Sequence, residues 1–433
     1  MLSIVRVIKN FGIYFIGSAL LKSTSFILAP LTIYFLKPEE VGLLSLLNSF
    51  IAITSVIITF GLRQVLYIEF FHKNNHERIA MINDLIGIYC ALALPIILLL
   101  YTQLTFLNTH IFAEIATPLL LIIVLVQCFL SFFSELFYQV LIYRGQAFKL
   151  IQVQIFGAAI TLVLTLAALY LWHASLVGIL LANTTGIIAV CCCGLYEYIK
   201  KSLHKAHDVM RIKKNMCMYL VAGLPFIPSL LSAWIIASSN RWILASYCSL
   251  TEVGLYSLLE MLGSLFQMFI LYPLGAAYVP YVFEQFAQNK NSIQELDTNN
   301  KKIMLLAMAC LFLLACAGFF MFKSLAYTIL PVFYHTVVPY SLLLITGYIL
   351  LMGTYFASCY IQFCKKTIFL SGSLVISAVV NMCLSFILIP RYAIFGGLIA
   401  LVVAYAVYFL ITLAYNQWLH KTACLKQSIL LEI

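Results

Sequence analysis

Five charged side chains lie inside long apolar stretches of the sequence, where an ionisable group is costly to bury. Lys22, Arg63 and Arg241 are basic, and Glu135 and Glu260 are acidic. A charge at the centre of a membrane-spanning helix costs about 2.5–3.5 kcal/mol on insertion scales, so such residues commonly serve a function. Fixed cations there can bind an anion that has lost its water shell, while carboxylates can pair with them or carry a proton. We therefore treat these five residues as candidate site residues.

The depth of each basic residue suggests a different role. Lys22 follows Asn10 by 12 residues, or about 18 Å of helix, which places it near the membrane midplane. It can pair with another residue for assembly, but we favour a cation that faces a cavity. Arg63 is expected near the inner end of the second helix, where two interpretations remain open. It either anchors the helix at the interface or captures an anionic headgroup.

Arg241 and Glu260 are expected at equal depth on consecutive helices, because the turn between these helices lies near residue 250. An ion pair is the simplest resting state, and a phosphate that competes for the arginine can open it. Glu135 lies deep in its helix and has no evident partner in its own hairpin. It either carries a coupling proton or cation, or forms a hydrogen bond within the bundle.

The composition predicts that lipid surrounds the helices carrying these residues. Of the 433 residues, 64% are hydrophobic and 9% are charged, and the mean hydropathy is +1.05. A soluble domain carries roughly 25% charged residues. One span needs about 20 apolar residues, and the apolar run that starts at Phe11 is too long for a signal peptide. The apolar runs predict twelve spans near 11–36, 42–66, 84–107, 114–143, 150–172, 175–198, 216–247, 254–284, 302–323, 327–363, 367–389 and 394–419.

Basic residues in the loops predict the orientation of the chain. With the N-terminus in the cytoplasm, the inner segments hold nineteen Lys and Arg and the outer segments hold three. The opposite orientation would invert this ratio and break the positive-inside rule. We therefore expect both termini in the cytoplasm of a bacterial inner membrane. Topology explains the net charge of +10, so we expect no nucleic-acid partner.

An internal repeat divides the chain in two. Residues 40–47 read E-V-G-L-L-S-L-L and residues 252–259 read E-V-G-L-Y-S-L-L, so seven of eight positions match at an offset of 212. Halves of six helices each have the same orientation, as in the parallel repeats of many transporters. We expect an all-α membrane protein of about twelve helices, in two pseudo-symmetric six-helix bundles around a central cavity. The predicted parts are a bundle over 1–199, a basic linker over 200–215, a bundle over 216–419 and a tail over 420–433.

The sequence contains no pattern that indicates a metal or a cofactor. None of its thirteen cysteines forms a C-x-x-C pair, and most lie in apolar runs, where cysteine behaves as a small apolar residue. It also lacks the G-x-x-x-x-G-K-[S/T] loop that binds nucleotide phosphates. We expect neither a metal nor a cofactor.

Several short segments resemble one family of membrane proteins. They are the apolar run from Phe11 to Phe35 with K-P-E-E-V-G-L at 37–43, F-G-L-R at 60–63, N-R-W-I-L at 240–244 and E-V-G-L-Y at 252–256. Together they resemble polysaccharide-biosynthesis flippases of the O-antigen type. The superfamily of these flippases also contains multidrug exporters and lipid II flippases. Asn240 stands where the family more often has Asp, so a charge at that position is not expected here.

The resemblance implies a transporter and not an enzyme. Its substrate would be a short oligosaccharide on undecaprenyl pyrophosphate, turned from the cytoplasmic to the periplasmic face. Other partners would be membrane lipid, a glycan polymerase and a chain-length regulator. A cation-coupled multidrug exporter is the first alternative, but it would need more acidic and fewer basic residues in the membrane. A membrane glycan polymerase or ligase is the second, but the predicted outer loops are too short to host its chemistry.

Overall fold

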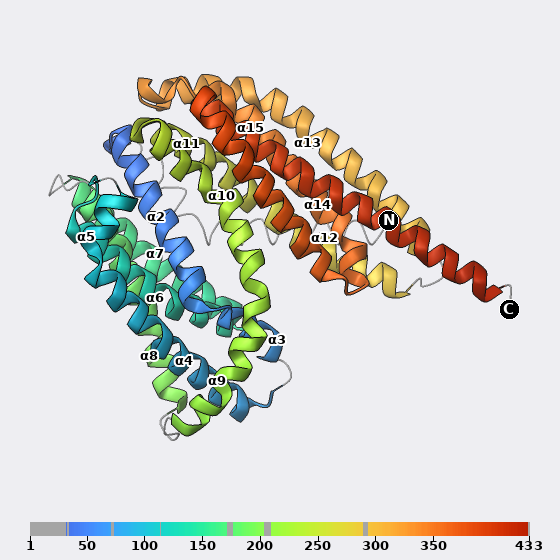
Figure 1. The fold of residues 1–433 in the computed structure, drawn as a ribbon, viewed down its shortest axis with the longest axis horizontal. Coiled ribbons are helices and arrows are strands. Elements are labelled where there is room, and N and C mark those ends of the chain that lie inside the picture. Colours follow the sequence, from blue (N-terminus) through green and yellow to red (C-terminus); the bar gives the residue numbers. More distant parts are fainter. Residues whose placement is uncertain are drawn as a thin grey trace. The chain divides into compact units, whose positions relative to one another are not determined.

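The computed structural model describes residues 32, 34–70, 73–112, 114–170, 176–202, 209–288 and 293–431 (Figure 1). All regular elements in these ranges are helices. The predictions made for residues 1–31, including Lys22, lie outside the described residues.

The first group of helices runs from residue 38 to residue 223. Two of these helices have clear N-terminal caps. Asn74 and Glu77 form a capping box at the start of α4, and the Thr117 side chain caps α6 ahead of Pro118. The elements are α2 (Pro38–Thr59), α3 (Leu62–Glu69), α4 (Asn75–Thr102), α5 (Leu104–Phe106), a π-helical turn (Leu107–Ile111), α6 (Pro118–Tyr143), α7 (Ala147–Tyr170), α8 (Leu176–Ser202) and α9 (Val209–Gly223).

The second group begins at the 3₁₀ turn Leu224–Phe226 and contains longer helices. Its elements are α10 (Ile227–Tyr247), α11 (Leu250–Phe266), a π-helical turn (Gln267–Leu271), α12 (Tyr272–Gln288), α13 (Ile293–Ile329), 3₁₀ turns at Val332–Tyr334 and Val338–Tyr340, α14 (Ser341–Phe363) and α15 (Thr367–Leu431). Pro225 lies in the first 3₁₀ turn, and it interrupts the α-helix there because proline has no backbone N–H to donate.

Within the described residues, ten helical runs are long and apolar enough to cross a membrane. One of them, Thr367–His420, is 54 residues long and contains the non-helical residue Ala393 (φ 47°), three residues after Pro390. This break lies between the two helices that the sequence predicts at 367–389 and 394–419. Over the residues that the structure describes, the chain is therefore an all-helical membrane protein with about ten candidate spans.

Several predicted helix limits differ from the structure. The helices predicted over 216–247 and 254–284 are each divided by a short turn, and the one predicted over 302–323 is longer, as α13. The helix predicted over 42–66 is interrupted, because Phe60 (φ 45°) and Gly61 (φ 72°) leave the right-handed helical region, and Arg63 lies on the short helix α3 beyond that break. The helix predicted from residue 84 begins at Asn75, where a capping box starts it. The helix predicted over 327–363 is instead the end of α13 followed by α14.

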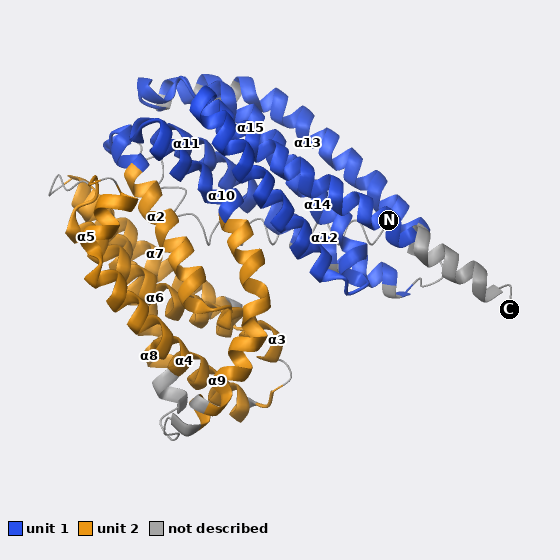
Figure 2. Cartoon of the chain, viewed as in Figure 1, with its two compact units in different colours: residues 1–42, 235–433 blue, residues 43–234 orange. Residues whose placement is uncertain are grey.

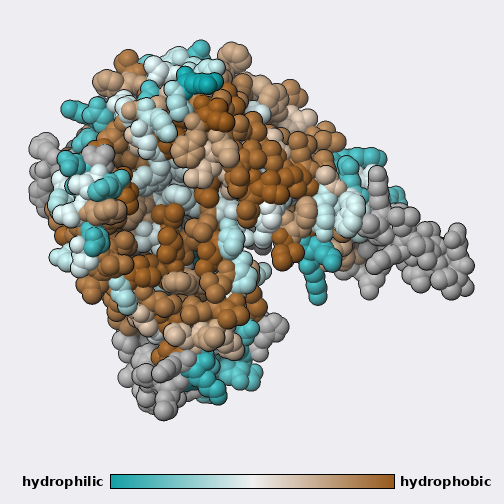
Figure 3. Space-filling model, viewed as in Figure 1, coloured by the Kyte–Doolittle hydropathy of each residue, from teal (hydrophilic) through white to brown (hydrophobic). Residues whose placement is uncertain are grey.

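The chain forms two compact units, which Figure 2 colours separately. Unit 1 contains residues 1–42 and 235–433, and unit 2 contains residues 43–234. The helices α2 and α10 therefore each contribute residues to both units. Many large apolar side chains are exposed on the helices, among them Leu98 at 63% and Leu314 at 67%, and Figure 3 shows extensive hydrophobic surface. A lipid environment accounts for this exposure.

Candidate functional site

The interruption of the helix after α2 determines the position of Arg63. The left-handed Gly61 packs against the backbone of Gly223, at the point where α9 gives way to the 3₁₀ turn that contains Pro225. A Cβ atom at either glycine would overlap the backbone of the opposite segment. Two interrupted helices of unit 2 therefore meet at their breaks, and this contact fixes the start of α3, from which Arg63 projects.

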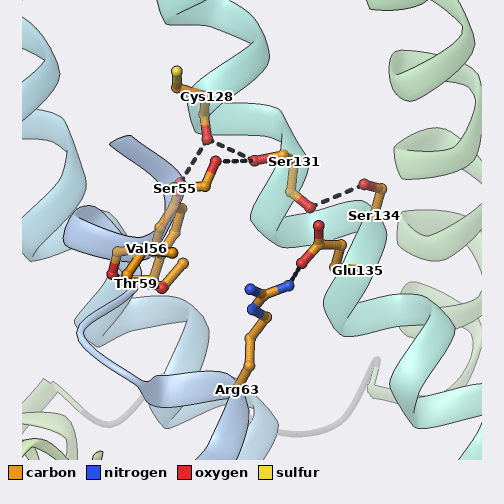
Figure 4. Close-up of polar contacts among 9 residues, drawn as sticks. Ser55, Val56, Thr59, Arg63, Cys128, Ser131, Ser134 and Glu135 are labelled. Carbon is orange, nitrogen blue, oxygen red and sulfur yellow. Dashed lines mark hydrogen bonds and ion pairs between the residues drawn. The ribbon is translucent and has the colours of Figure 1, made fainter. Parts of the chain in front are cut away.

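Arg63 forms an ion pair with Glu135 of α6 (Figure 4). The Arg63 side chain is 20% exposed and that of Glu135 is 43% exposed. The Nε atom of Arg63 is buried and has no hydrogen-bond partner among the described residues. The guanidinium therefore retains donor capacity for a further anion while it pairs with the carboxylate. Glu135, for which the sequence suggested no partner, has one 72 positions earlier in the chain.

Glu135 belongs to a line of polar residues along α6. Gln127, Ser131, Glu135 and Gln139 follow one another at intervals of four, so they lie along one side of the helix. Gln127 donates to the Leu180 carbonyl and to Thr184, and Ser131 lies 3.1 Å from the Ser55 hydroxyl of α2. The four-residue spacing is a signal in the sequence that could have identified this polar line beside Glu135.

Arg241 and Glu260 form the ion pair that the sequence predicts, and it lies within unit 1. The Glu260 side chain is only 7% exposed and that of Arg241 is 19% exposed. As with Arg63, the Arg241 Nε is buried without a hydrogen-bond partner among the described residues. A carboxylate this deeply buried depends on its counter-ion, because an unpaired buried charge is strongly unfavourable.

Asn240, next to Arg241, is a fully buried centre of hydrogen bonds. Its amide nitrogen donates to the Tyr256 hydroxyl and to the Gly397 carbonyl, both at 3.0 Å. Its carbonyl oxygen accepts from Asn381 at 3.2 Å and from Ser385 at 2.7 Å. The neutral amide therefore joins α10, α11 and both parts of α15, and a carboxylate there could not donate the first two bonds.

The structure also contains two charged clusters that the sequence analysis did not single out. Asp84 of α4 accepts from Arg211 at 2.9 and 3.0 Å and from Asn215 at 2.9 Å. Asp297 of α13 lies 2.7 Å from both Lys301 and His420. Both aspartates are about 1% exposed. Only the spacing of Asp297 and Lys301, one helical turn apart, was visible in the sequence.

The two copies of the repeat contact each other in unit 1. A Cβ atom at Gly42 would overlap the carbonyl oxygen of Leu250, and one at Gly254 would overlap that of Pro38. Adding the offset of 212 to Pro38 and Gly42 gives Leu250 and Gly254, so the two contacts are reciprocal. Reciprocal contacts of this kind are the mark of a two-fold relation between the packed segments.

The candidate site residues in the described ranges thus form two separate arginine–glutamate pairs, one in each unit. No group of three or more His, Cys, Asp or Glu in the described ranges could hold a metal ion. Each arrangement offers a paired guanidinium with a spare donor, which suits reversible binding of an anion rather than bond-breaking chemistry.

Solved transporters share this helical arrangement. An inward-facing multidrug resistance MATE family transporter of the MOP superfamily aligns with a TM-score of 0.70 at 14% identity, over 95% of this chain and 96% of that one. The inward closed conformation of the lipid II flippase MurJ aligns with a TM-score of 0.70 at 13% identity, over 96% of this chain and 87% of that one. A MOP superfamily transporter from Pyrococcus furiosus aligns with a TM-score of 0.59 at 13% identity, over 95% of each chain. The fold is therefore that of the MOP superfamily, with two pseudo-symmetric lobes.

A family model identifies the branch of this superfamily. The model for polysaccharide biosynthesis proteins matches residues 7–286, which is more than half of the chain, and the chain belongs to that family. It is a multi-pass membrane protein with the fold of MOP superfamily transporters. None of the curated proteins matches the sequence.

Proposed function

We propose that the protein is a flippase that moves an undecaprenyl-pyrophosphate-linked oligosaccharide, an O-antigen or capsule repeat unit, from the cytoplasmic to the periplasmic face by alternating access. The observation that carries this proposal is the pairing of Arg63 and Arg241 with glutamates, each arginine with a spare buried donor. Membership of the polysaccharide biosynthesis family supports a glycan as cargo. The likeness to the MurJ fold supports a lipid-linked one.

In this mechanism the arginines exchange partners. A pyrophosphate that enters the path competes with Glu135 for Arg63, or with Glu260 for Arg241. The arginine then replaces part of the hydration that the pyrophosphate has lost. Release of the carboxylate then shifts the conformational equilibrium toward the next state of the transport cycle. Lys22 supplies a third cation.

As further parts of this proposal, twelve helices form two six-helix bundles around a central cavity, over 1–199 and 216–419, joined by a linker over 200–215 and followed by a tail over 420–433.

Transport into sealed vesicles tests the proposal. Proteoliposomes containing the purified protein should move a short glycan on undecaprenyl pyrophosphate to the side where a glycosidase can cleave it. Lys22→Ala should reduce the transport rate at least about tenfold, because a lost charge-assisted contact is worth about 1.5–3 kcal/mol. Arg391→Ala is the control, because Arg391 lies at a predicted outer turn. If wild-type vesicles leave the lipid-linked glycan protected, the flippase proposal is wrong.

Orientation in the membrane is a separate part of the proposal. Reporter fusions at Ala206 and Asn108 should give cytoplasmic and periplasmic signals respectively, because basic loops stay inside. The same location for both fusions would rule out the proposed topology. With the termini in the cytoplasm of the inner membrane, the substrate enters from the side on which it is assembled. A glycan polymerase and a chain-length regulator are then the proposed partners on the opposite face.

A cation-coupled multidrug exporter is the second candidate, because a MATE family transporter shares the fold. Glu135, 43% exposed on the polar line of α6, would then be the coupling group. This candidate predicts that Glu135→Gln abolishes resistance to lipophilic cations in a drug-sensitive strain. Surface glycan would be unchanged in the same cells.

A further inference from the structure

Unit 2 contains a cavity of about 490 Å³ that none of the candidate site residues lines. It lies between α4, α6 and α8, and its wall is almost entirely apolar, with Ile82, Phe137 and Val140 among its residues. Arg144 and Glu197 are the charged residues of its lining. The volume is within the usual range for a small-molecule site, about 300–1,000 Å³.

The length of the wall matches one leaflet of a bilayer. Along α6 the lining extends from Leu130 to Arg144, which is 14 residues or about 21 Å at 1.5 Å per residue. One leaflet of a bilayer, including its headgroup region, is about 20–22 Å thick. The residues Cys192 and Leu195 of α8 line the cavity and are themselves exposed, so the cavity opens on the surface that faces lipid. A hydrocarbon chain can enter from the side.

The charged end of the cavity has a cation available. Arg144 forms no ion pair with any residue in the described ranges, whereas Glu197 pairs with Lys149. Burial lowers the pKa of Arg144, nearby Arg78 lowers it further, and Glu197 acts to raise it. Because Glu197 already pairs with Lys149, the charge of Arg144 leaves this end of the cavity with an excess of positive charge. An anion is therefore the complementary ligand.

The second half of the chain has a different arrangement at the corresponding helices. There the third, fourth and sixth predicted helices are α13, α14 and the end of α15. Asp297 of α13 binds Lys301 and His420, and Asn416 donates to the Ala357 carbonyl of α14 at 2.8 Å. Buried polar groups join α13, α14 and the end of α15, whereas α4, α6 and α8 enclose an apolar space. The polar contacts between these helices of unit 1 thus contrast with the apolar wall of the cavity in unit 2.

We propose that this cavity binds an anionic membrane phospholipid, with one acyl chain between α4, α6 and α8 and its phosphate at Arg144. Basic pockets between membrane helices are a recognised way of binding anionic lipid headgroups. The proposal concerns a lipid of the surrounding bilayer and is independent of which glycan, if any, the protein carries.

Native mass spectrometry of the purified full-length protein, titrated with phosphatidylglycerol, tests the proposal. Wild-type protein should retain one tightly bound phosphatidylglycerol. Arg144→Gln should weaken its retention about fivefold, the equivalent of about 1 kcal/mol for one basic residue near a charged surface. Lys366→Gln is the matched control, since Lys366 is an exposed cation at the turn after α14 and should change nothing.

A second variant fills the cavity and tests the chain-binding part. Cys192→Trp adds bulk at an exposed position of the lining and should abolish the bound lipid, while Cys310→Trp, at an exposed cysteine of α13, should retain it. Equal retention of phosphatidylglycerol in wild type and Cys192→Trp would overturn the proposal. So would equally tight retention of phosphatidylcholine by wild type. Selective loss of undecaprenyl phosphate instead of phosphatidylglycerol from Cys192→Trp would also overturn it and identify the carrier lipid as occupant.

Discussion

Replacing Arg241 by glutamine is expected to abolish surface glycan and to lower the amount of folded protein in the membrane. Glu260 is 7% exposed and has Arg241 as its ion-pair partner, so the substitution leaves a buried carboxylate without a counter-ion. Breaking such a pair commonly costs about 3–5 kcal/mol. Immunoblots of membrane fractions and staining of surface glycan from the same cells measure the two effects separately.

The double variant Arg241→Gln, Glu260→Gln separates structure from transport. Removing both charges restores neutrality, so protein level and thermal stability should return close to those of wild type. Surface glycan should remain absent, because the cation that would compete for pyrophosphate is gone. Wild-type glycan in the double variant would show that the pair is structural only. Arg241→Lys should retain part of the activity if charge alone matters, and little if the planar guanidinium is needed.

The second large effect is expected at the glycine contact between the two repeats. Gly254→Ala should greatly reduce transport and destabilise the protein by about 1–3 kcal/mol or more, because its Cβ would overlap the carbonyl oxygen of Pro38. The backbone segments must separate to accept even one methyl group. Thermal unfolding in detergent and surface glycan in cells measure these changes.

Two further variants show whether the effect comes from the reciprocal contact. Gly42→Ala should reproduce the effect of Gly254→Ala, because its Cβ would overlap the carbonyl oxygen of Leu250 in the same way. Gly318→Ala is the control. It lies inside α13 with open space around the new methyl group, so it should be neutral or stabilising by up to about 1 kcal/mol. If all three variants behave alike, close packing at the repeat has no special role.

Several features of the site were predictable because they depend on local sequence. An apolar run has to be about as long as the bilayer is thick, and a charge inside such a run is visible without any knowledge of its neighbours. The pairing of Arg241 with Glu260 was also predictable, because two helices joined by a short turn place residues equidistant from that turn at equal depth. The repeat at residues 40–47 and 252–259 was visible because it is a direct match between two stretches of the sequence.

The sequence by itself therefore determined that the protein spans a membrane, that its helices carry buried charges and that its halves are related. Only the tertiary structure decided which distant surfaces meet. Glu135 pairs with Arg63 because the helix breaks at Phe60 and Gly61 after α2. The contact of Gly61 with Gly223 then directs α3 so that Arg63 reaches α6. Hydrophobic length and periodicity set how far a helix runs and which side is apolar. They leave open which of many similar apolar faces pack together, since that depends on close side-chain fit between segments far apart in the chain.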